Sequence, residues 1–447
     1  MESLAFTANI SCSLVSAVLL VKIWRRDIFF AIFFSMLVLY SIVSMWGYLL
    51  YPDISQAVLN MYFEVPALVY ASTFTMLSLL SLYLGYSYIY KPITQPIRFH
   101  LRESKALPGF FLIIAILFVF IIGCGYFYYA DVLSYSNASD EEFLLSAGLN
   151  YKLFWQIYKF SPFILLTFYA LIRSQAFKTP LDRIVLLVVS YIYFALFLLI
   201  TSAVGSRTDP LALALGFLAY EYYFRRYLAS RVAVSNGRRL VNFRRKFTLM
   251  AIGFAGVTLV LLTVLEISRG GRGIGRDDIE ASTMVQAFLL KDYYWPFHVL
   301  IGAIHHNYID PVSVIASNVG NSLMFIGVEY LQYFIVEQWA PASVTRTASP
   351  AMYAFTEGFV MLGWLGFIYN GIIWALGISL WRLFSRSSDE RCNALAFAIT
   401  VAVAVTVART QSSYFIKDIY LWFLPTFALY AIATGIRLKC RAKSPSS

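Results

Sequence analysis

The sequence predicts an all-α, polytopic integral membrane protein with about eleven transmembrane helices. The first observation is composition: 60% of the 447 residues are hydrophobic and only 13% are charged, whereas soluble domains carry about 45–50% apolar and about 25% charged residues. The second is that apolar segments of membrane-spanning length recur along the whole chain. The third is that lysines and arginines are concentrated in alternate loops between these segments.

Each predicted span is an apolar stretch that approaches the roughly 20 residues needed for a helix to cross the hydrocarbon core. In chain order the predicted spans are Leu4–Trp24, Ile28–Leu50, Val65–Tyr90, Pro108–Ala130, Phe160–Ser174, Ile184–Ser206, Pro210–Phe224, Phe247–Ile267, Ala354–Trp381, Ala394–Val407 and Ile419–Ile436. The fifth, seventh and tenth are short or carry polar residues, so about ten to twelve spans fit the pattern. The first lacks the basic flank and cleavage site of a signal peptide and is expected to be retained.

The distribution of lysine and arginine predicts the orientation, because short cytoplasmic loops collect these residues. Of the 35 basic residues, 25 fall in alternate loops that hold only five acidic residues. This pattern places the N-terminus outside, the C-terminus inside and the long segment Ser268–Tyr353 on the outer face. The net charge of +11 therefore reflects topology, and we expect no nucleic-acid partner.

The spans and the long outer segment divide the chain into three parts. Residues 1–267 form an N-terminal membrane bundle of about eight spans. Residues 268–353 form an extracytoplasmic loop with short amphipathic or re-entrant helices, and residues 354–447 form a C-terminal bundle of about three spans with a basic cytoplasmic tail. The sequence holds no GxxxxGK[ST], HExxH or GxSxG motif, which argues against an ATP-driven pump, a zinc protease and a serine hydrolase.

Ten basic residues fall on the predicted outer face, and most lie close to the ends of spans. A guanidinium group offers a planar fork of donors that matches phosphate oxygens, so outer arginines at the bundle rim suggest an anionic ligand. Arg207 lies in a very short turn between two spans; pairing with Asp209 is the alternative. The basic residues near span ends are Arg207, Arg269, Arg272, Arg276, Lys291, Arg346, Arg409 and Lys417.

The segment that follows the eighth predicted span is rich in both glycine and arginine. Four of the six residues 270–275 are glycines, which disfavour a helix and let main-chain N–H groups approach an anion. Arg269, Arg272 and Arg276 supply charge, so we expect phosphate or diphosphate binding; a flexible basic tether on lipid headgroups is the alternative. Asp277 and Glu280 have the spacing of a capping box, which we favour over a divalent cation site, so no bound metal is expected.

Three side chains are candidates for a general base. His305 and His306 follow a short apolar run in the outer segment, and histidine titrates near neutral pH; a structural role is the alternative. Glu357 opens the ninth predicted span, where a carboxylate is costly unless it is used or paired; a first-turn acid favoured by the helix dipole is the alternative. The sequence leaves open which of the three acts as the base.

Three short motifs, together with the predicted topology, resemble the bacterial O-antigen (oligosaccharide repeat unit) polymerases, the Wzy-like membrane glycosyltransferases. They are Gly205-Ser-Arg207, Ser268-Arg269-Gly-Gly-Arg272-Gly, and Glu357-Gly-Phe-Val-Met-Leu-Gly363-Trp-Leu-Gly366. The pair His306-Asn307 also resembles a His-Asn element of the related O-antigen ligases.

The resemblance implies an enzyme of the bacterial inner membrane that joins polyprenyl-diphosphate-linked oligosaccharides on the outer face. For this reaction we expect the diphosphate to be held by Arg207, Arg269, Arg272, Arg276 and Arg409, and the proton of the acceptor hydroxyl to be taken by His305, His306 or Glu357. No cofactor is needed because the donor is already activated. Membrane lipids and a chain-length regulator protein are the other expected partners.

Two alternatives stay open. An O-antigen ligase would share the site and differ only in its acceptor. A flippase for the same lipid would place charged residues inside the spans, around a central cavity, whereas the charged residues of this sequence are concentrated near the ends of the predicted spans. The pattern favours chemistry on one face of the membrane over transport through it.

Overall fold

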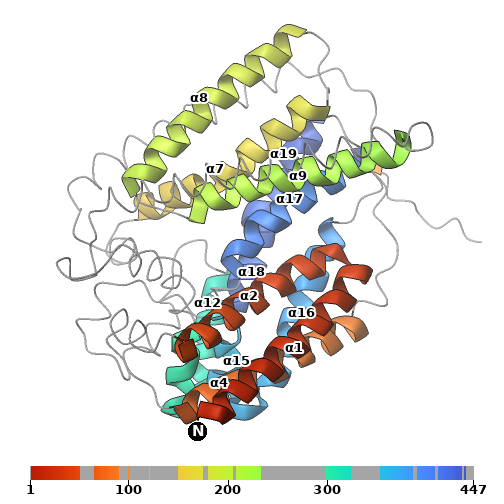
Figure 1. Ribbon diagram of the computed structural model, residues 1–447. Coiled ribbons are helices and arrows are strands. Elements are labelled where there is room, and N and C mark those ends of the chain that lie inside the picture. Colours follow the sequence, from red (N-terminus) through yellow and green to blue (C-terminus); the bar gives the residue numbers. More distant parts are fainter. Residues whose placement is uncertain are drawn as a thin grey trace, which may run out of the picture.

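The computed structural model describes residues 2–50, 65–89, 99–100, 120, 149–174, 180–204, 208–232, 297–323, 353–385, 390–407, 411–434 and 437–438. These residues are almost entirely helical (Figure 1). Four helical stretches among them are long and apolar enough to cross a membrane: Ser3–Arg26, Ile28–Leu50, Val65–Ile89 and Thr356–Leu383. The prediction of a membrane protein built from helices is therefore confirmed, while the predicted number of spans is not.

Each predicted span that lies within the described residues coincides with helix. Pro108–Ala130, apart from Phe120, and Phe247–Ile267 lie outside them. The helices are α1 (Glu2–Arg26), α2 (Ile28–Leu50), α4 (Val65–Ile89), α7 (Leu149–Ser174), α8 (Pro180–Val204), α9 (Thr208–Val232), α12 (Pro311–Leu323), α15 (Thr356–Leu362), the 3₁₀ turn η1 (Gly363–Leu365), α16 (Gly366–Ser385), α17 (Glu390–Val407), α18 (Ser412–Asp418), the π-helical turn η2 (Ile419–Phe423) and α19 (Leu424–Thr434). Residues 297–305 are also helical.

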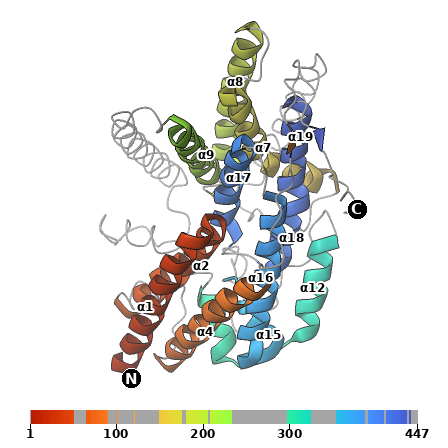
Figure 2. The same cartoon turned by 90° about the vertical axis from the view of Figure 1, so that its right-hand side faces the viewer.

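Helices from the two ends of the chain pack against each other. Helix α16 lies against α4, and α17 lies against both α9 and α2. Figures 1 and 2 show α1, α2 and α4 beside α15 and α16, while α7 and α9 lie beside α17 and α19. One hydrophobic core runs through these contacts and includes Phe33, Trp374 and Phe415. Helix α8 lies at the edge and exposes Leu181 and Tyr191, as expected of a surface solvated by lipid.

Asp27 joins three helices at the junction between α1 and α2. Its Oδ1 accepts the N–H of Phe29 at 2.9 Å and so caps α2 at the N-terminus. Its Oδ2 accepts the hydroxyl of Tyr86 on α4 at 2.9 Å and Nε of Arg382 on α16 at 3.0 Å. All of these helix ends are predicted on the cytoplasmic side of the membrane, and the contacts show that they lie together.

Contacts near the opposite ends of the same helices also follow the predicted alternation. The Asn9 side chain on α1 donates to the carbonyl of Met45 on α2 at 3.0 Å, and Ser72 on α4 donates to Asn9 Oδ1 at 2.8 Å.

Two short strands pair on the predicted cytoplasmic side. Strands β1 (Phe99–His100) and β2 (Arg437–Leu438) are antiparallel, and both belong to loops predicted on that side. Ends expected on one side of the membrane therefore lie together.

The ninth predicted span, Ala354–Trp381, is not one straight helix. Gly363 ends α15 with a φ of +58°, a conformation that glycine adopts at little cost, and the chain turns through η1 into α16. The carbonyls of Ala354 and Phe355 then accept hydrogen bonds from Trp374 and Asn370 on α16. Since residues before the turn contact residues well after it, α15 folds back along the first turns of α16 as a short, antiparallel half-helix.

Candidate functional site

Glu357 on α15 is a fully buried carboxylate where four elements meet, with 0% of its surface exposed. Its Oε1 accepts hydrogen bonds from Asn318 Nδ2 on α12 at 2.6 Å, from the Tyr369 hydroxyl on α16 at 2.7 Å and from the Ser412 hydroxyl on α18 at 2.8 Å. Its Oε2 accepts the main-chain N–H of Ser412 at 2.8 Å. Among the described residues these donors are all neutral, so hydrogen bonds rather than an ion pair compensate the buried carboxylate.

The bond to the Ser412 N–H gives α18 a cap supplied by another helix. Gln411 is the N-cap residue of α18 and makes no side-chain capping bond of its own. The first N–H groups of a helix have no partner within that helix and favour a negative charge. Glu357 supplies this partner from α15, so the start of α18 is fixed relative to the half-helix.

Two glycines allow α15 to lie directly on α16. A Cβ at Gly358 would overlap the carbonyl oxygen of Gly366 and the side chain of Asn370, and a Cβ at Gly366 would overlap the main chain of Gly358. Any larger residue would push the half-helix away from α16. The glycines that follow Glu357 in the sequence therefore have a packing role, because they set the depth at which the carboxylate lies.

His305 and His306 end the helix formed by residues 297–305, and both are exposed. The N–H of Tyr308 binds the carbonyl of Ala303 at 2.9 Å and that of Asn307 binds Ile304 at 3.1 Å, which is a Schellman turn. Asn307 takes the left-handed conformation with a φ of +47°. Although His306 is largely exposed, partial desolvation of its ring and then the neighbouring His305 lower the pKa of His306 below its usual value.

The segment after the histidines connects them to the half-helix. The N–H of Asp310 donates to the carbonyl of Val360 on α15 at 2.8 Å. The Asp310 side chain accepts the N–H of Ser313 at 3.1 Å and its hydroxyl at 2.5 Å, which caps α12 and lowers the pKa of the Asp310 carboxyl. The histidine turn therefore lies next to the C-terminal part of α15, whereas Glu357 lies near its N-terminal part.

The structure describes three of the predicted site residues. His305 and His306 are adjacent, with ring centroids 4.9 Å apart, and neither is a hydrogen-bond partner of Glu357. The expected diphosphate ligands Arg207, Arg269, Arg272, Arg276 and Arg409 lie outside the described residues. Lys417, another basic residue of the predicted outer face, lies on α18 and is only 6% exposed.

Sequence reasoning missed Asn318, Tyr369 and Ser412, the three donors to Glu357. Ser412 follows Arg409 closely, and its segment was noted only for that arginine. Asn318 is one of several polar residues on α12, and its partner is 39 residues away. The signal that could have found these residues is the buried carboxylate itself, because a buried Glu357 requires nearby donors.

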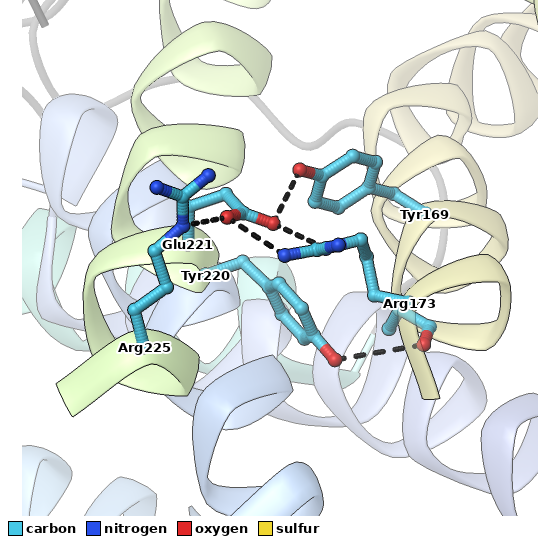
Figure 3. A network of polar contacts seen from close by, with 6 residues as sticks. Tyr169, Arg173, Tyr220, Glu221 and Arg225 are labelled. Atoms are coloured by element: carbon cyan, nitrogen blue, oxygen red, sulfur yellow. Dashed lines mark hydrogen bonds and ion pairs between the residues drawn. The ribbon is translucent and has the colours of Figure 1, made fainter. Parts of the chain in front are cut away.

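A second polar network joins α7 to α9 away from Glu357 (Figure 3). Glu221 accepts Nε and Nη2 of Arg173 at 2.5 and 3.1 Å, Nε of Arg225 at 2.5 Å and the hydroxyl of Tyr169 at 2.7 Å. Figure 3 shows the carboxylate between the two guanidinium groups. The hydrogen-bond partners of Glu221 among the described residues are side chains of α7 and α9. We therefore interpret the network as a structural connection between these two helices.

The described residues contain no group of three or more His, Cys, Asp or Glu side chains able to hold a metal ion. Comparison with protein-family models, with curated proteins and with solved structures gives no match to the chain. The chemistry of the site therefore has to be argued from its own residues.

Proposed function

We propose that this chain is a polysaccharide polymerase, a glycosyltransferase of the bacterial cytoplasmic membrane that joins polyprenyl-diphosphate-linked oligosaccharide repeat units on the outer face. Its product would be O-antigen, capsule or exopolysaccharide. The N-terminus then lies in the periplasm and the C-terminus in the cytoplasm, as the distribution of basic residues predicts. The apolar helices, which are long enough to span a bilayer, supply the membrane setting that a lipid-linked donor requires.

The observation that carries the proposal is the pair of hydrogen bonds between Glu357 and Ser412. Arg409 precedes Ser412 by three residues, and three residues of extended chain span at most about 11 Å. The half-helix that contacts the histidine turn is thus bonded to the segment that follows an expected diphosphate-binding arginine. The histidine turn that carries a candidate base and the helix that follows Arg409 in the sequence are thus both bonded to α15, which supports the proposal.

The proposed reaction is a substitution at the anomeric carbon of the donor sugar. The acceptor hydroxyl oxygen forms the new glycosidic bond, the bond from the anomeric carbon to the diphosphate oxygen breaks, and its electron pair leaves with the diphosphate. Preorganised guanidinium groups stabilise the charge that develops on the leaving group. A base removes the proton of the acceptor hydroxyl.

His306 is our first candidate for this base. It is exposed, and its lowered pKa keeps the imidazole neutral, and thus able to accept a proton, at neutral pH. Glu357 is buried at 0% exposure, so we assign it the role of a positioning residue that holds the start of α18. His305 would then act through its charge on His306. Arg207, Arg269, Arg272, Arg276 and Arg409 keep their expected role at the diphosphate.

Deleting the gene from its host and examining the surface glycan tests the proposal. Surface chains that stop after one repeat unit support a polymerase. Long lipid-linked chains that are not transferred to their final acceptor indicate a ligase, which the same site chemistry would serve. Loss of every outer-face intermediate indicates a flippase and overturns the proposal.

A further inference from the structure

Two hydrogen-bond partners define the orientation of the Asn318 side-chain amide. Its Nδ2 donates to Glu357 Oε1 at 2.6 Å and to the Tyr369 hydroxyl oxygen at 3.2 Å. The Tyr369 hydroxyl uses its own hydrogen on Glu357, so it can only accept from the amide. A carboxylate likewise only accepts. The NH₂ group therefore faces Glu357, and the amide oxygen points elsewhere.

That oxygen is buried and lacks a donor. Among the described residues no hydrogen-bond donor reaches Asn318 Oδ1, and the same is true of the buried Oγ1 of Thr356, the neighbour of Glu357. A buried acceptor left without a donor is costly and rare in native structures. An unpartnered acceptor on a residue that donates to Glu357 indicates a place that a ligand hydroxyl can occupy.

The position of Asn318 on α12 indicates the direction of approach. Val312, Ile315 and Val319 on the same helix are 76%, 51% and 52% exposed, so one face of α12 is apolar and, as far as the described residues show, exposed. Figure 2 shows α12 beside α15 and α18, which it contacts. Asn318 is only partly buried and lies between the buried Ser317 and the exposed Val319 in the sequence. A lipid-linked molecule bound along this apolar face would lie next to the residue that carries the buried acceptor.

We propose that Asn318 Oδ1 accepts a hydrogen bond from a sugar hydroxyl of the lipid-linked glycan, which approaches along the apolar face of α12. This inference rests on the proposed glycosyltransferase function and adds a residue that selects the substrate. The chemistry is specific, because a site built to bind a hydroxyl discriminates strongly against an analogue that lacks it. Asn318 therefore recognises one hydroxyl group of the repeat unit.

The test uses the full-length chain in lipid nanodiscs with the host's lipid-diphosphate-linked repeat unit and a set of its mono-deoxy analogues. For the wild-type protein, kcat/KM is expected to fall about 10- to 100-fold for one analogue of the set. Asn318→Ala is expected to lower kcat/KM for the complete substrate and to abolish most of that selectivity. Asn318→Ser gives the same readout if the alanine variant does not accumulate, since a ratio of rates does not depend on the folded fraction.

Ser317→Ala is the matched control. Ser317 precedes Asn318 on α12 and donates to Gln411 Oε1 at 3.0 Å rather than to Glu357, so its loss should leave the hydroxyl selectivity intact. If Asn318→Ala slows every analogue equally and the selectivity persists, Asn318 is only structural and the inference is wrong while the proposed function stands. If the wild-type protein polymerises none of the lipid-linked substrates, both are wrong.

Discussion

The carboxylate of Glu357 and the main-chain N–H of Ser412 are hydrogen-bonded, with 2.8 Å between Oε2 and N, although the two residues are 55 positions apart in the sequence. The bond connects a half-helix that folds back on α16 with the first residue of α18. It defines the relative position of the two elements that our proposal assigns to the reaction. Its energetic contribution can be measured directly.

Glu357→Gln is expected to lower the free energy of unfolding by about 1–3 kcal/mol. In either orientation of the glutamine amide, the NH₂ group faces a donor: the Ser412 N–H on one side, or the three donors to Oε1 on the other. Thermal unfolding of the protein in nanodiscs measures the change. Tyr369→Phe is the control, because it removes one of these hydrogen bonds without adding a donor and should cost about 1 kcal/mol. Equal stability of the wild-type and glutamine proteins would contradict the described cap.

Gly358→Ala is expected to destabilise the hairpin of α15 and α16 by about 1–3 kcal/mol. The added methyl group would overlap the main-chain oxygen of Gly366, which cannot move without shifting the helix. Gly216→Ala is the control, because its Cβ would meet the flexible end of the Leu166 side chain at 2.9 Å and should cost less. Equal losses for the two variants, measured by thermal unfolding, would show that the close approach of α15 to α16 is unimportant.

The sequence was sufficient to predict that helices solvated by lipid make up the chain, because composition and segment length alone determine that class. It was not sufficient to predict the break at Gly363. Glycine is common in membrane helices, and the fold-back is evident only from contacts between α15 and α16 such as that of Gly358 with Gly366. The pairing of Glu357 with Asn318 and Ser412 could not be predicted either, since those contacts join three helices that are distant in the sequence.

The histidine pair shows a different limit of sequence reasoning. The sequence predicts His305 and His306 as candidate bases, and no structural observation tests that prediction. The structure adds a local reason for the motif His305-His306-Asn307, because Asn307 adopts the left-handed turn that ends the helix and a histidine near a helix C-terminus is compatible with the dipole. A motif can therefore be structurally required and still be available for chemistry.

Glu221→Gln and Arg173→Met are expected to be strongly coupled, with an interaction free energy of about 0.5–3 kcal/mol in a double-mutant cycle of unfolding. The two side chains share a bidentate ion pair whose carboxylate is only 4% exposed. Glycan length should be unchanged at equal protein levels, because this network lies on α7 and α9. As a control, Arg173→Met combined with Arg382→Met should be additive within about 0.5 kcal/mol. Additivity in the first pair would refute the ion pair.

As the pH is lowered, activity is expected to fall only below about pH 6.5. The pH at which it falls is expected to shift when His305 is replaced. Burial, and then the charge of His305, lower the pKa of His306, so the neutral base persists below the usual histidine value of about 6.5. His305→Gln removes the second cause, which raises the pKa of His306 and moves the acid limb of the activity profile to higher pH. The measurement is kcat/KM between about pH 4.5 and pH 8. An acid limb that does not move in His305→Gln would instead argue against His306 as the base.

Arg272→Ala and Arg409→Ala are each expected to abolish chain growth while the protein remains in the membrane. A guanidinium group that stabilises the departing diphosphate acts mainly in the transition state, so its loss lowers kcat rather than protein abundance. Arg409→Lys should recover little activity, because an ammonium group lacks the planar fork that binds two phosphate oxygens. The readouts are glycan length on the cell surface and the amount of protein in the membrane fraction.

Arg26→Ala is the matched control for these arginine variants. Arg26 donates to the Tyr83 hydroxyl at 3.3 Å and lies in a loop predicted on the opposite side of the membrane, so its loss should leave glycan length unchanged. Shortened chains in all three alanine variants would mean that general loss of positive charge, and not an anion site on one face, limits the reaction. Normal chains in Arg272→Ala would remove that residue from the mechanism, and normal chains in both site variants would leave the diphosphate without its proposed ligands. Loss of chain growth confined to Arg272→Ala and Arg409→Ala is the result that one-sided transfer requires, because only the outer face holds the lipid-linked donor in this proposal.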